Sequence, residues 1–490
     1  MADGITPRAT DYSQWYLDVI AAAELSDYSP VKGCMVFRPH GFAVWDLMKN
    51  DLDRRFRETG HVNAYFPLLI PVSFLSKEAQ HVEGFAKECA VVTHHRLRMA
   101  EGGGVEPDPA SKLEEPLVIR PTSETIIWHM YGQWIQSWRD LPILINQWAN
   151  IVRWEMKTRP FLRTAEFLWQ EGHTAHATRS EAVEEARRML DVYEAFAADV
   201  LALPVVKGVK STSERFAGAE DTYCIEALMQ NGWALQAGTS HFLGQNFARA
   251  FDVSFQNTAG EREFVWATSW GVSTRLIGAV IMTHSDDTGL VLPPAVAPVQ
   301  VVITPIWKSD SERELVLGHA ERVRAALGSE FRVKVDARDT IKPGAKYFEW
   351  ERKGVPLRLE IGPRDVAGDS VFAAPRTGGK KFGIPAATVA DGVRAALAAI
   401  QAELYSRARA RRDETMRTCA SYEGFKVELE KGGFVRTYWA DDAANEEKIK
   451  EDTKATIRCF PLEGQEEAAG QTCFYSGRPA THVALFARAY

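Results

Sequence analysis

Residues 150–175 decide the fold, and they read Asn150-Ile-Val-Arg-Trp-Glu-Met-Lys-Thr-Arg-Pro-Phe-Leu-Arg-Thr-Ala-Glu-Phe-Leu-Trp-Gln-Glu-Gly-His-Thr-Ala175. We interpret them as an apolar strand ending in Arg153 and Glu155, a short loop, and a second strand carrying Arg163 and Glu166. Residues two apart in a strand share a face. Arg153 and Glu155 should therefore point the same way, as should a second set: Phe167, Trp169, Glu171 and His173.

Fixed cations, carboxylates and aromatic rings would then lie on one concave side of this hairpin. Such a surface suits an anion that carries a flat base, together with a small cationic partner. An amphipathic hairpin with surface ion pairs, each worth little free energy, is an equally good interpretation of this stretch alone.

Composition narrows the class of protein. A chain of 490 residues is long enough for about three domains. Its 46% hydrophobic and 25% charged residues are ordinary for a soluble globular protein. No apolar run is long enough to span a bilayer, and the N-terminus has no secretory signal pattern. Six scattered cysteines fit reduced cytosolic thiols, which predicts a cytoplasmic protein.

The hydrophobic pattern divides the chain into three parts. Helices are expected over 41–59 and from the capping box at Thr178 to about 203, and a strand containing Pro67 is expected over 62–71. The proline-rich segment 291–298 is interpreted as a linker. Beyond it, strands alternate with helices, which indicates a small α/β domain. We therefore expect a catalytic domain over 1–290, an α/β domain over 296–405 and a third mixed unit over 406–490.

Three further blocks carry polar residues in apolar surroundings. Residues 120–125, Arg-Pro-Thr-Ser-Glu-Thr, follow an apolar strand, and their Thr and Glu could hold a small ammonium, although a simple helix cap is an alternative. Residues 235–246 place Gln236, Thr239 and His241 in an apolar strand, where a satisfied core histidine is the alternative. Residues 268–275 end in an arginine that begins an apolar helix and could lie flat over an aromatic base.

Together these blocks resemble the signature motifs of class II aminoacyl-tRNA synthetases, and their order and spacing resemble prolyl-tRNA synthetase of the archaeal and eukaryotic type. The resemblance covers nearly the whole chain, from Gly33 to Tyr490. It implies an α+β protein: a class II antiparallel sheet flanked by helices, then an α/β anticodon-binding domain, then a small α/β C-terminal domain. It also implies a homodimer that activates L-proline with ATP and transfers it to proline tRNA.

By this resemblance each matching residue takes an expected role. The proline-binding residues would be Thr122, Glu124, Arg153 and His241, with Trp169, His173 and Trp270 lining the proline slot. ATP with its Mg²⁺ would be held by Arg153, Glu155, Arg163, Thr164, Gln236, Thr239, Ser273 and Arg275, with Phe167 stacked on adenine. The catalytic charges on the phosphate would be Arg153, Arg163 and Arg275, because proline's own carboxylate is the nucleophile and no strong base is required. The anticodon readers would be Glu360 and Arg364.

The C-terminal unit departs from this family. Relatives of this type often hold a structural zinc with two cysteine pairs, but the matching positions here are Ala440, Asn445, Cys473 and Ser476. One thiolate cannot make a closed four-ligand zinc site. We therefore expect no structural zinc.

Two alternatives to the proline enzyme remain from the sequence. One is a sister class II synthetase, with threonine as the nearest substrate. The other is a catalytically silent paralogue that binds tRNA or regulates a partner, which would require eroded motifs.

Overall fold

A large central sheet organises the molecule. The computed structural model describes residues 4–79 and 88–490, and within them this sheet has eleven strands in the order β22-β23-β25-β24-β11-β12-β13-β16-β10-β9-β3. Its neighbours are antiparallel except for β3 with β9 and β22 with β23. The part before residue 290 consists of β3 (Val62–Asn63), β9 (Ile143–Val152), β10 (Glu166–His176), β11 (Val205–Val209), β12 (Asp221–Leu228), β13 (Ala234–Gly244) and β16 (Trp266–Ser273).

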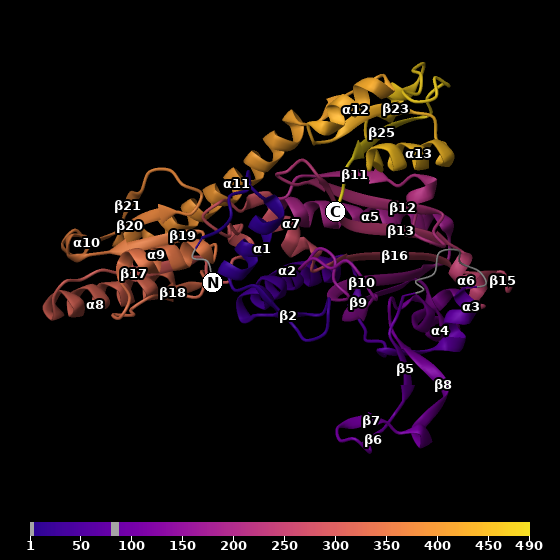
Figure 1. The fold of residues 1–490 in the computed structure, drawn as a ribbon, viewed down its shortest axis with the longest axis horizontal. Helices are drawn as coiled ribbons and strands as arrows, with labels where there is room; N and C mark the ends of the chain where they lie inside the picture. The colour runs from indigo at the N-terminus through magenta and orange to yellow at the C-terminus, as the bar shows by residue number, and fades with distance from the viewer. Residues whose placement is uncertain (1–3, 80–87) are drawn as a thin grey trace.

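Helices cover one face of this sheet and form the main core with it (Figure 1). They are α1 (Tyr12–Ala22), α2 (Pro39–Glu58), α5 (Arg179–Asp199) and α7 (Arg275–His284). Helix α5 begins at the predicted capping box, in which Thr178 and Glu181 each bond the other's backbone N–H. The short pair β1 (Ser26–Tyr28) and β2 (Met35–Phe37) precedes α2.

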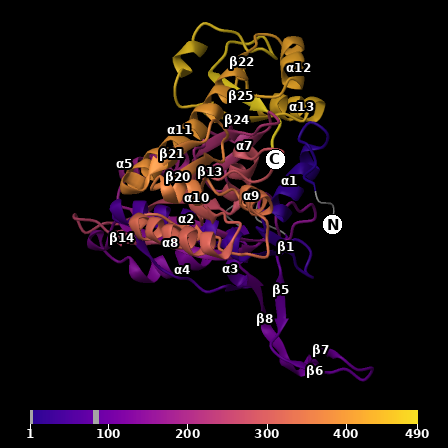
Figure 2. The same ribbon diagram turned by 90° about the vertical axis from the view of Figure 1, so that its left-hand side faces the viewer.

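A second group of elements packs against the sheet in a separate core, and a narrow arm projects from it. It contains α3 (Val72–Ala79), α4 (Glu124–Trp134), α6 (Asn246–Ala250), the hairpin β14 (Ser254–Gln256) and β15 (Arg262–Phe264), and the small sheet β4-β8-β5. The arm projects away from the body in both ribbon views (Figures 1 and 2). The strands of this small sheet and the arm are β4 (Leu69–Pro71), β5 (Val91–His94), β6 (Leu97–Met99), β7 (Val105–Pro107) and β8 (Lys112–Ile119).

The middle domain is an α/β unit with its own core. Its sheet has the order β18-β17-β19-β20-β21, in which β17 pairs in parallel with β18 and β19. The strands are β17 (Val301–Pro305), β18 (Val333–Val335), β19 (Leu357–Ile361), β20 (Ser370–Pro375) and β21 (Phe382–Pro385). The helices are α8 (Asp310–Leu327), α9 (Pro343–Arg352) and α10 (Pro363–Ala367).

Helix α11 (Val389–Glu414) leads from this domain to the C-terminal unit, and it crosses the molecule diagonally in Figure 1. The C-terminal unit contains β22 (Arg417–Thr418), α12 (Tyr422–Glu430), β23 (Val435–Trp439), α13 (Ala443–Thr453), β24 (Thr456–Pro461) and β25 (His482–Ala487). Its strand β24 pairs with β11 through Gly208↔Pro461 and Val209↔Phe460, so this unit extends the catalytic sheet.

The predicted fold class is confirmed, while several local expectations differ from the structure. Segment 62–71 is not one strand, since β3 and β4 are separated by residues without strand pairing. The boundary expected at 405/406 falls inside α11. The expected linker at 291–298 is packed into the protein, because Val291 is 3% exposed, and Leu292 and Val296 belong to the main core. No described helix is long and apolar enough to cross a membrane.

Candidate active site

A cavity of about 320 Å³ opens on the face of the large sheet that is turned away from α5. Ser240 in β13 points toward α5, where its Oγ donates a hydrogen bond to the carbonyl of Ala186 at 2.7 Å. Its neighbours Thr239 and His241 point to the opposite face and line the cavity. Because side chains alternate along β13, one set of them packs in the helical core and the other set lines the cavity.

Strand register arranges the cavity floor in rows of side chains. Gly271 of β16 lies between Glu171 of β10 and Thr239 of β13. Because Gly271 has no side chain, the floor is open between the two polar neighbours. The next row contains His173, Ser269 and His241.

Most of the residues predicted to bind proline or ATP lie at this cavity. Its lining includes Thr122, Glu124, Arg153, Phe167, Trp169, His173, Gln236, Thr239, His241, Trp270, Ser273 and Arg275. The structure therefore brings together side chains from α4, from the end of β9, and from β10, β13, β16 and α7.

Three predicted ATP-binding residues do not line the cavity: Glu155, Arg163 and Thr164. Arg163 lies in the loop before β10 rather than on that strand, and its Nε donates to Glu155 Oε2 at 2.7 Å. Glu155 also accepts from the Lys157 backbone N–H at 2.9 Å. The strand β9 ends at Val152, so Arg153 and Glu155 lie beyond it, although the Arg153 backbone N–H still donates to the Ala165 carbonyl at 2.8 Å. Arg153 lines the cavity and Glu155 does not.

Trp270 borders the cavity, but its ring packs on the other face of the sheet. The ring centroid lies 5.0 Å from that of Phe56 and 6.3 Å from that of Tyr193, within the helical core. Gly172 lies against this ring, since a Cβ there would lie 2.1 Å from the indole. Among the tryptophans expected to wall the proline slot, the structure thus favours Trp169 over Trp270.

Glu171, which the sequence places on the concave face without a specific contact, is the centre of a buried network. Its side chain accepts from Ser123 Oγ at 2.5 Å and from Gln147 Nε2 at 2.8 Å, while Oε2 bonds His173 Nε2 at 3.0 Å. The Ser123 hydroxyl therefore serves Glu171 instead of capping α4. These contacts fix the orientation of the His173 ring at the cavity wall.

The two histidines of the cavity have opposite pKa shifts. Burial would lower the pKa of His173, but the hydrogen bond to Glu171 and the charge of Glu124 raise it above its ordinary value. Burial opposes ionisation of Glu171 as well, and its bond to His173 nevertheless holds its pKa below the usual range. Burial and the nearby charge of His173 lower the pKa of His241 to about 3. His241 is therefore neutral at physiological pH, and its Nδ1 bonds Thr222 Oγ1 at 3.0 Å.

Two of the three arginines that line the cavity, Arg153 and Arg275, are close enough for their charges to interact. Arg153 donates from Nε to the Pro121 carbonyl at 2.9 Å, and its guanidinium lies 5.6 Å from the ring centroid of Trp169. Arg275 donates from Nε to the Leu162 carbonyl at 3.2 Å. Burial and the charge of Arg153 lower the pKa of Arg275 to about 10, and burial lowers that of Arg153 too.

Within the described residues, the side-chain hydrogen bonds of both arginines go to backbone carbonyls, and neither is paired directly with a carboxylate. Both remain protonated near neutral pH, although burial and, for Arg275, the charge of Arg153 oppose the charged form. The carboxylates of Glu124 and Glu171 favour the charge on Arg153, and that of Glu226 favours the charge on Arg275, without bonding them directly. A bound anion would relieve this electrostatic strain. The cavity is therefore suited to a polyanion that lies between two guanidinium groups.

Sequence reasoning also missed the wall formed by the segment 214–222. Phe216 lies with its ring centroid 4.5 Å from that of His241, and Glu214, Arg215 and Thr222 complete this side of the cavity. Thr222 lies directly opposite His241 in the register of β12 and β13. The register between β12 and β13 would have identified this wall. The spacing of residues in the sequence does not give that register.

The two predicted anticodon readers lie in the α/β domain and do not line the cavity. Glu360 is near the end of β19, where its Oε1 accepts from Arg358 Nε at 3.1 Å and from Lys381 Nζ at 2.7 Å. Arg364 lies in α10 and is exposed.

No cluster of three or more His, Cys, Asp or Glu side chains that could hold a metal ion occurs among the described residues. At the expected zinc positions, Cys473 Sγ accepts a hydrogen bond from the Ser476 backbone N–H at 3.5 Å. Asp442 Oδ2 accepts from Arg478 Nη2 at 2.6 Å. The absence of zinc remains a prediction.

Family profiles match three successive parts of the chain. Residues 105–284 match the tRNA synthetase class II core domain (G, H, P, S and T), and residues 300–396 match an anticodon binding domain. Residues 422–490 match the C-terminal domain described as "Prolyl-tRNA synthetase, C-terminal".

Three full-length relatives with the same name are similar to this chain. The chain is 58% identical over 490 residues to the proline–tRNA ligase of Bacteroides fragilis, covering 99% of both chains. It is 57% identical to that of Porphyromonas gingivalis, again over 99% of both, and 55% identical to that of Flavobacterium johnsoniae over the whole of both. On this similarity, and on the class II core around its cavity, the chain belongs to the prolyl-tRNA synthetase family of class II aminoacyl-tRNA synthetases.

Proposed function

We propose that this enzyme activates L-proline with ATP and transfers the prolyl group to the 3′ end of proline tRNA. In the first step a carboxylate oxygen of proline attacks the α-phosphorus of ATP, an O–P bond forms, and pyrophosphate leaves with the electrons of the broken P–O bond. In the second step a hydroxyl of the terminal ribose attacks the prolyl carbonyl and forms an ester C–O bond. The C–O bond to the phosphate breaks, AMP leaves with its electrons, and the hydroxyl proton passes to the departing phosphate. The observation that carries this proposal is the pair of buried arginines without a directly bonded carboxylate, Arg153 and Arg275, in a cavity with a buried carboxylate.

The proline end of the cavity would be the part near Glu124. This carboxylate is 4% exposed and bonded by the Thr122 hydroxyl. It would accept the secondary ammonium of proline as a charge-assisted hydrogen bond. Trp169, His173 and His241 would enclose the pyrrolidine ring, while Arg153 would contact the carboxylate end.

The ATP end would be the part between Arg153 and Arg275. Their charges would stabilise the negative charge that develops on the phosphate oxygens, and Phe167 would stack on the adenine. Gln236, Thr239 and Ser273 would supply hydrogen bonds to the nucleotide. Mg²⁺ would bind together with ATP through the phosphate oxygens, because it takes few protein ligands and keeps several waters. It would supply further positive charge there.

Glu155, Arg163 and Thr164 would reach ATP only if the loop between β9 and β10 moved. Arg163 is 63% exposed and is held by Glu155 in the structure. We therefore assign their ATP contacts to a closed form of this loop, in which Arg163 exchanges Glu155 for a phosphate.

In its domain layout the enzyme would be of the archaeal and eukaryotic type, although the relatives named above are bacterial. Between β10 and β13 the chain contains α5, β11, a short 3₁₀ helix and β12, which leaves no room for an inserted hydrolytic domain. A C-terminal domain follows the anticodon-binding domain. In this proposal Glu360 and Arg364 read bases of the anticodon by hydrogen bonds to base edges.

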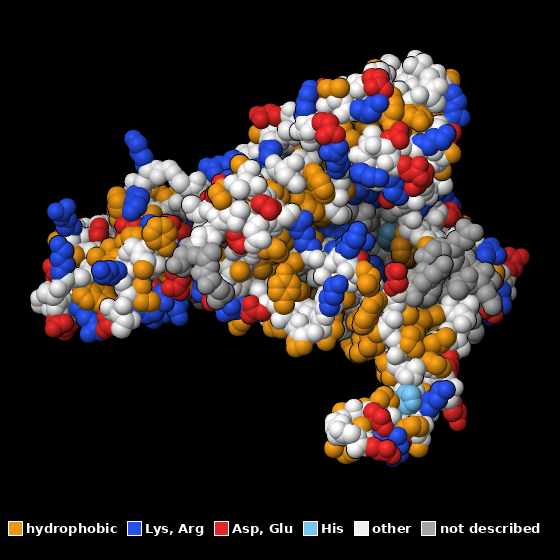
Figure 3. Space-filling model, in the orientation of Figure 1, with side chains coloured by type: hydrophobic (Ala, Val, Ile, Leu, Met, Phe, Trp, Pro, Cys, Tyr) orange, Lys and Arg blue, Asp and Glu red, His pale blue; other side chains and the backbone are white. Residues whose placement is uncertain are grey.

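A cytoplasmic homodimer is the proposed working form. Apolar side chains are exposed along the arm, as Figure 3 shows. Leu97 is 62%, Met99 74% and Val105 64% exposed in the arm, and Tyr65, in the segment before it, is 71% exposed. Large exposed apolar patches mark protein interfaces. Sedimentation equilibrium of the purified protein tests this assignment, and a monomer at micromolar concentration would contradict it.

The test of the activity is ATP–pyrophosphate exchange with each standard amino acid. Proline is expected to give the signal. A signal with threonine instead would establish the sister synthetase, and no signal with any amino acid would favour the silent paralogue.

A further inference from the structure

Helix α7 connects the ATP end of the cavity to the boundary with the anticodon-binding domain. It begins at Arg275 in the cavity wall and ends at His284, which at 1.5 Å per residue is about 13.5 Å away. The residues from Leu276 to Thr283 are all buried. A short helix that is packed on all sides moves as one body, so a constraint at its last turn also constrains Arg275.

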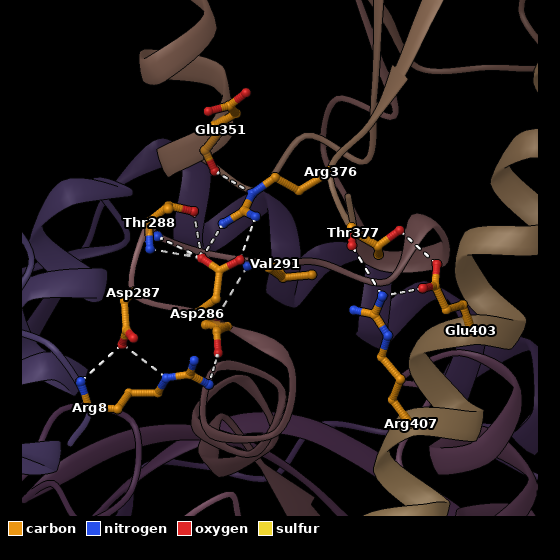
Figure 4. Close-up of polar contacts among 12 residues, drawn as sticks. Arg8, Asp286, Asp287, Thr288, Val291, Glu351, Arg376, Thr377, Glu403 and Arg407 are labelled. Atoms are coloured by element: carbon orange, nitrogen blue, oxygen red, sulfur yellow. Dashed lines mark hydrogen bonds and ion pairs between the residues drawn. The ribbon is translucent and has the colours of Figure 1, made fainter. Parts of the chain in front are cut away.

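The last turn of α7 leads directly into Asp286, whose carboxylate binds an arginine of the other domain. Arg376 donates from Nη1 to Asp286 Oδ2 and from Nη2 to Oδ1, both at 2.7 Å (Figure 4). The side chain of Arg376 is only 5% exposed. Such a two-bond, fork-to-fork pair fixes geometry as well as charge.

The local chain is built to hold Asp286 in place for this contact. Its Oδ1 also accepts from the Thr288 backbone N–H at 2.9 Å and from the Thr288 hydroxyl at 2.6 Å. Burial raises the pKa of Asp286, but the bonds from Arg376 outweigh it and bring this pKa to about 2. Asp286 is therefore ionised at every physiological pH.

Arg376 in turn is bonded to the region that would read the anticodon. Its Nε donates to the Glu351 carbonyl at 3.0 Å, as Figure 4 shows, and Glu351 Oε1 accepts from Arg358 Nη1 at 2.8 Å. Arg358 also donates to Glu360, the proposed base reader, at 3.1 Å. Hydrogen bonds thus run from Glu360 through Arg358 to the Glu351 side chain, and from the Glu351 backbone carbonyl through Arg376 to Asp286.

Other contacts hold the end of α7 without involving the anticodon-binding sheet. Arg411 Nη2 donates to the Thr283 carbonyl at 2.9 Å, His284 Nε2 bonds the Leu201 carbonyl at 2.9 Å, and Gln230 Nε2 donates to the Ser285 carbonyl at 2.8 Å. Loss of the Arg376 pair would therefore leave the helix in place. It would remove a link between this helix and the other domain.

We infer that Asp286 and Arg376 are positioning residues that couple occupation of the anticodon-binding face to the placement of Arg275 in the ATP site. Binding of a base edge at Glu360 changes how Arg358 divides its bonds between Glu360 and Glu351. The change reaches α7 through Arg376 and Asp286, and a well-placed Arg275 then binds the ATP phosphates more tightly. This inference rests on the proposed function, because it requires that both tRNA and ATP are ligands.

The experiment measures the KM for ATP in proline-dependent pyrophosphate exchange, with and without proline tRNA whose terminal ribose has been oxidised so that it cannot be charged. In the unaltered enzyme this tRNA should lower the KM for ATP by about fivefold or more, the lower end of usual allosteric couplings. In Arg376→Gln and Asp286→Asn the effect should fall below about twofold, while the KM without tRNA stays within about twofold of the original.

In the double variant the tRNA effect on the KM for ATP should be reduced no further than in either single variant, because the two residues act as one pair. Arg376→Lys should restore part of the effect, since one ammonium can replace one of the two bonds. Arg394→Gln is the matched control: Arg394 makes a two-bond pair with Glu330 at 2.7 and 2.8 Å on the exposed surface, and its loss should leave the tRNA effect intact.

Three results would overturn the inference. They are no tRNA effect in the unaltered enzyme, an undiminished effect in both single variants, or a KM without tRNA that rises as much as the KM with it. The last result would indicate a merely structural pair. Absence of exchange with proline in the unaltered enzyme would instead contradict the proposed function, so the two failures are distinguishable.

Discussion

Glu226→Gln should loosen the attachment of the C-terminal unit to the catalytic sheet. Glu226 lies in β12 and is fully buried. It accepts a hydrogen bond from Lys210 Nζ at 2.8 Å and two from Arg458 in β24, each at 3.1 Å. Lys210 is 2% exposed, and it also donates to the Arg458 carbonyl at 2.7 Å.

The size of the effect follows from the burial of these charges. Without the carboxylate, two cations remain out of water with no counter-charge, and removing one partner of a buried pair costs about 3–5 kcal/mol. At 1.4 kcal/mol per tenfold change, the opening equilibrium of β24 should rise by about a hundredfold to a few thousandfold. The amide of glutamine accepts one of the lost bonds at most, so it cannot offset this loss.

Hydrogen exchange followed by mass spectrometry on peptides covering 456–461 measures this opening locally. Protection of these amides should fall by the stated factor in Glu226→Gln. The control is Glu467→Gln, which breaks the half-exposed pair with Arg436 at 2.8 Å and should cost about 1 kcal/mol or less. Protection in Glu226→Gln that stays within fivefold of this control would refute the reasoning.

Acid should produce the same opening in the unaltered protein. Burial opposes ionisation of Glu226, but Arg458 and Lys210 hold its pKa below the ordinary 4.5. A lowered carboxyl pKa stabilises the fold above the unfolded pKa, and this stability is lost as the pH falls through the folded pKa. Protection over 456–461 should therefore be constant from pH 7 to about 5 and decline in more acidic solution.

Four further predictions concern the site and the metal. Arg153→Ala should reduce proline-dependent exchange by about 10²–10³, because it removes a charge aimed at the phosphate, and near-normal exchange would contradict its role. Glu124→Gln should mainly raise the KM for proline. An unchanged KM would show that Glu124 acts only as an acidic residue at the start of the helix. The purified enzyme should form some alanyl-tRNA and fail to hydrolyse it, since lost methylenes reject alanine by only about 1–3 kcal/mol; rapid deacylation would rule this out. Elemental analysis should find no stoichiometric zinc, whereas one zinc per chain would disprove the expectation drawn from Cys473 and Ser476.

The regular elements could be predicted because their signals are local. Thr178 and Glu181 form the capping box that begins α5, and the Ser309 side chain accepts from the Glu312 backbone N–H at the start of α8. The α/β alternation beyond residue 299 likewise follows from hydrophobic periodicity, which does not depend on distant contacts. The order of the motif blocks then placed most of the cavity residues together.

The features that could not be predicted depend on contacts between segments that are distant in the sequence. Glu171 is oriented by Ser123 and Gln147, and neither contact is visible in a strand pattern. The resemblance places Trp270 at the proline slot, although strand alternation turns its ring into the core. The segment 291–298 was interpreted from its prolines, whereas the burial of Val291 and Leu292 governs how it packs.

The pairing of β24 with β11 has a consequence for synthesis on the ribosome. About 250 residues separate the end of β11 at Val209 from Pro461, so at 5–20 residues per second β11 waits about 10–50 s for its partner. During this interval its outer edge exposes unpaired N–H and C=O groups, which are a template for pairing with another chain. Nascent chains stalled before residue 456 should therefore be the form of this protein that most needs a chaperone.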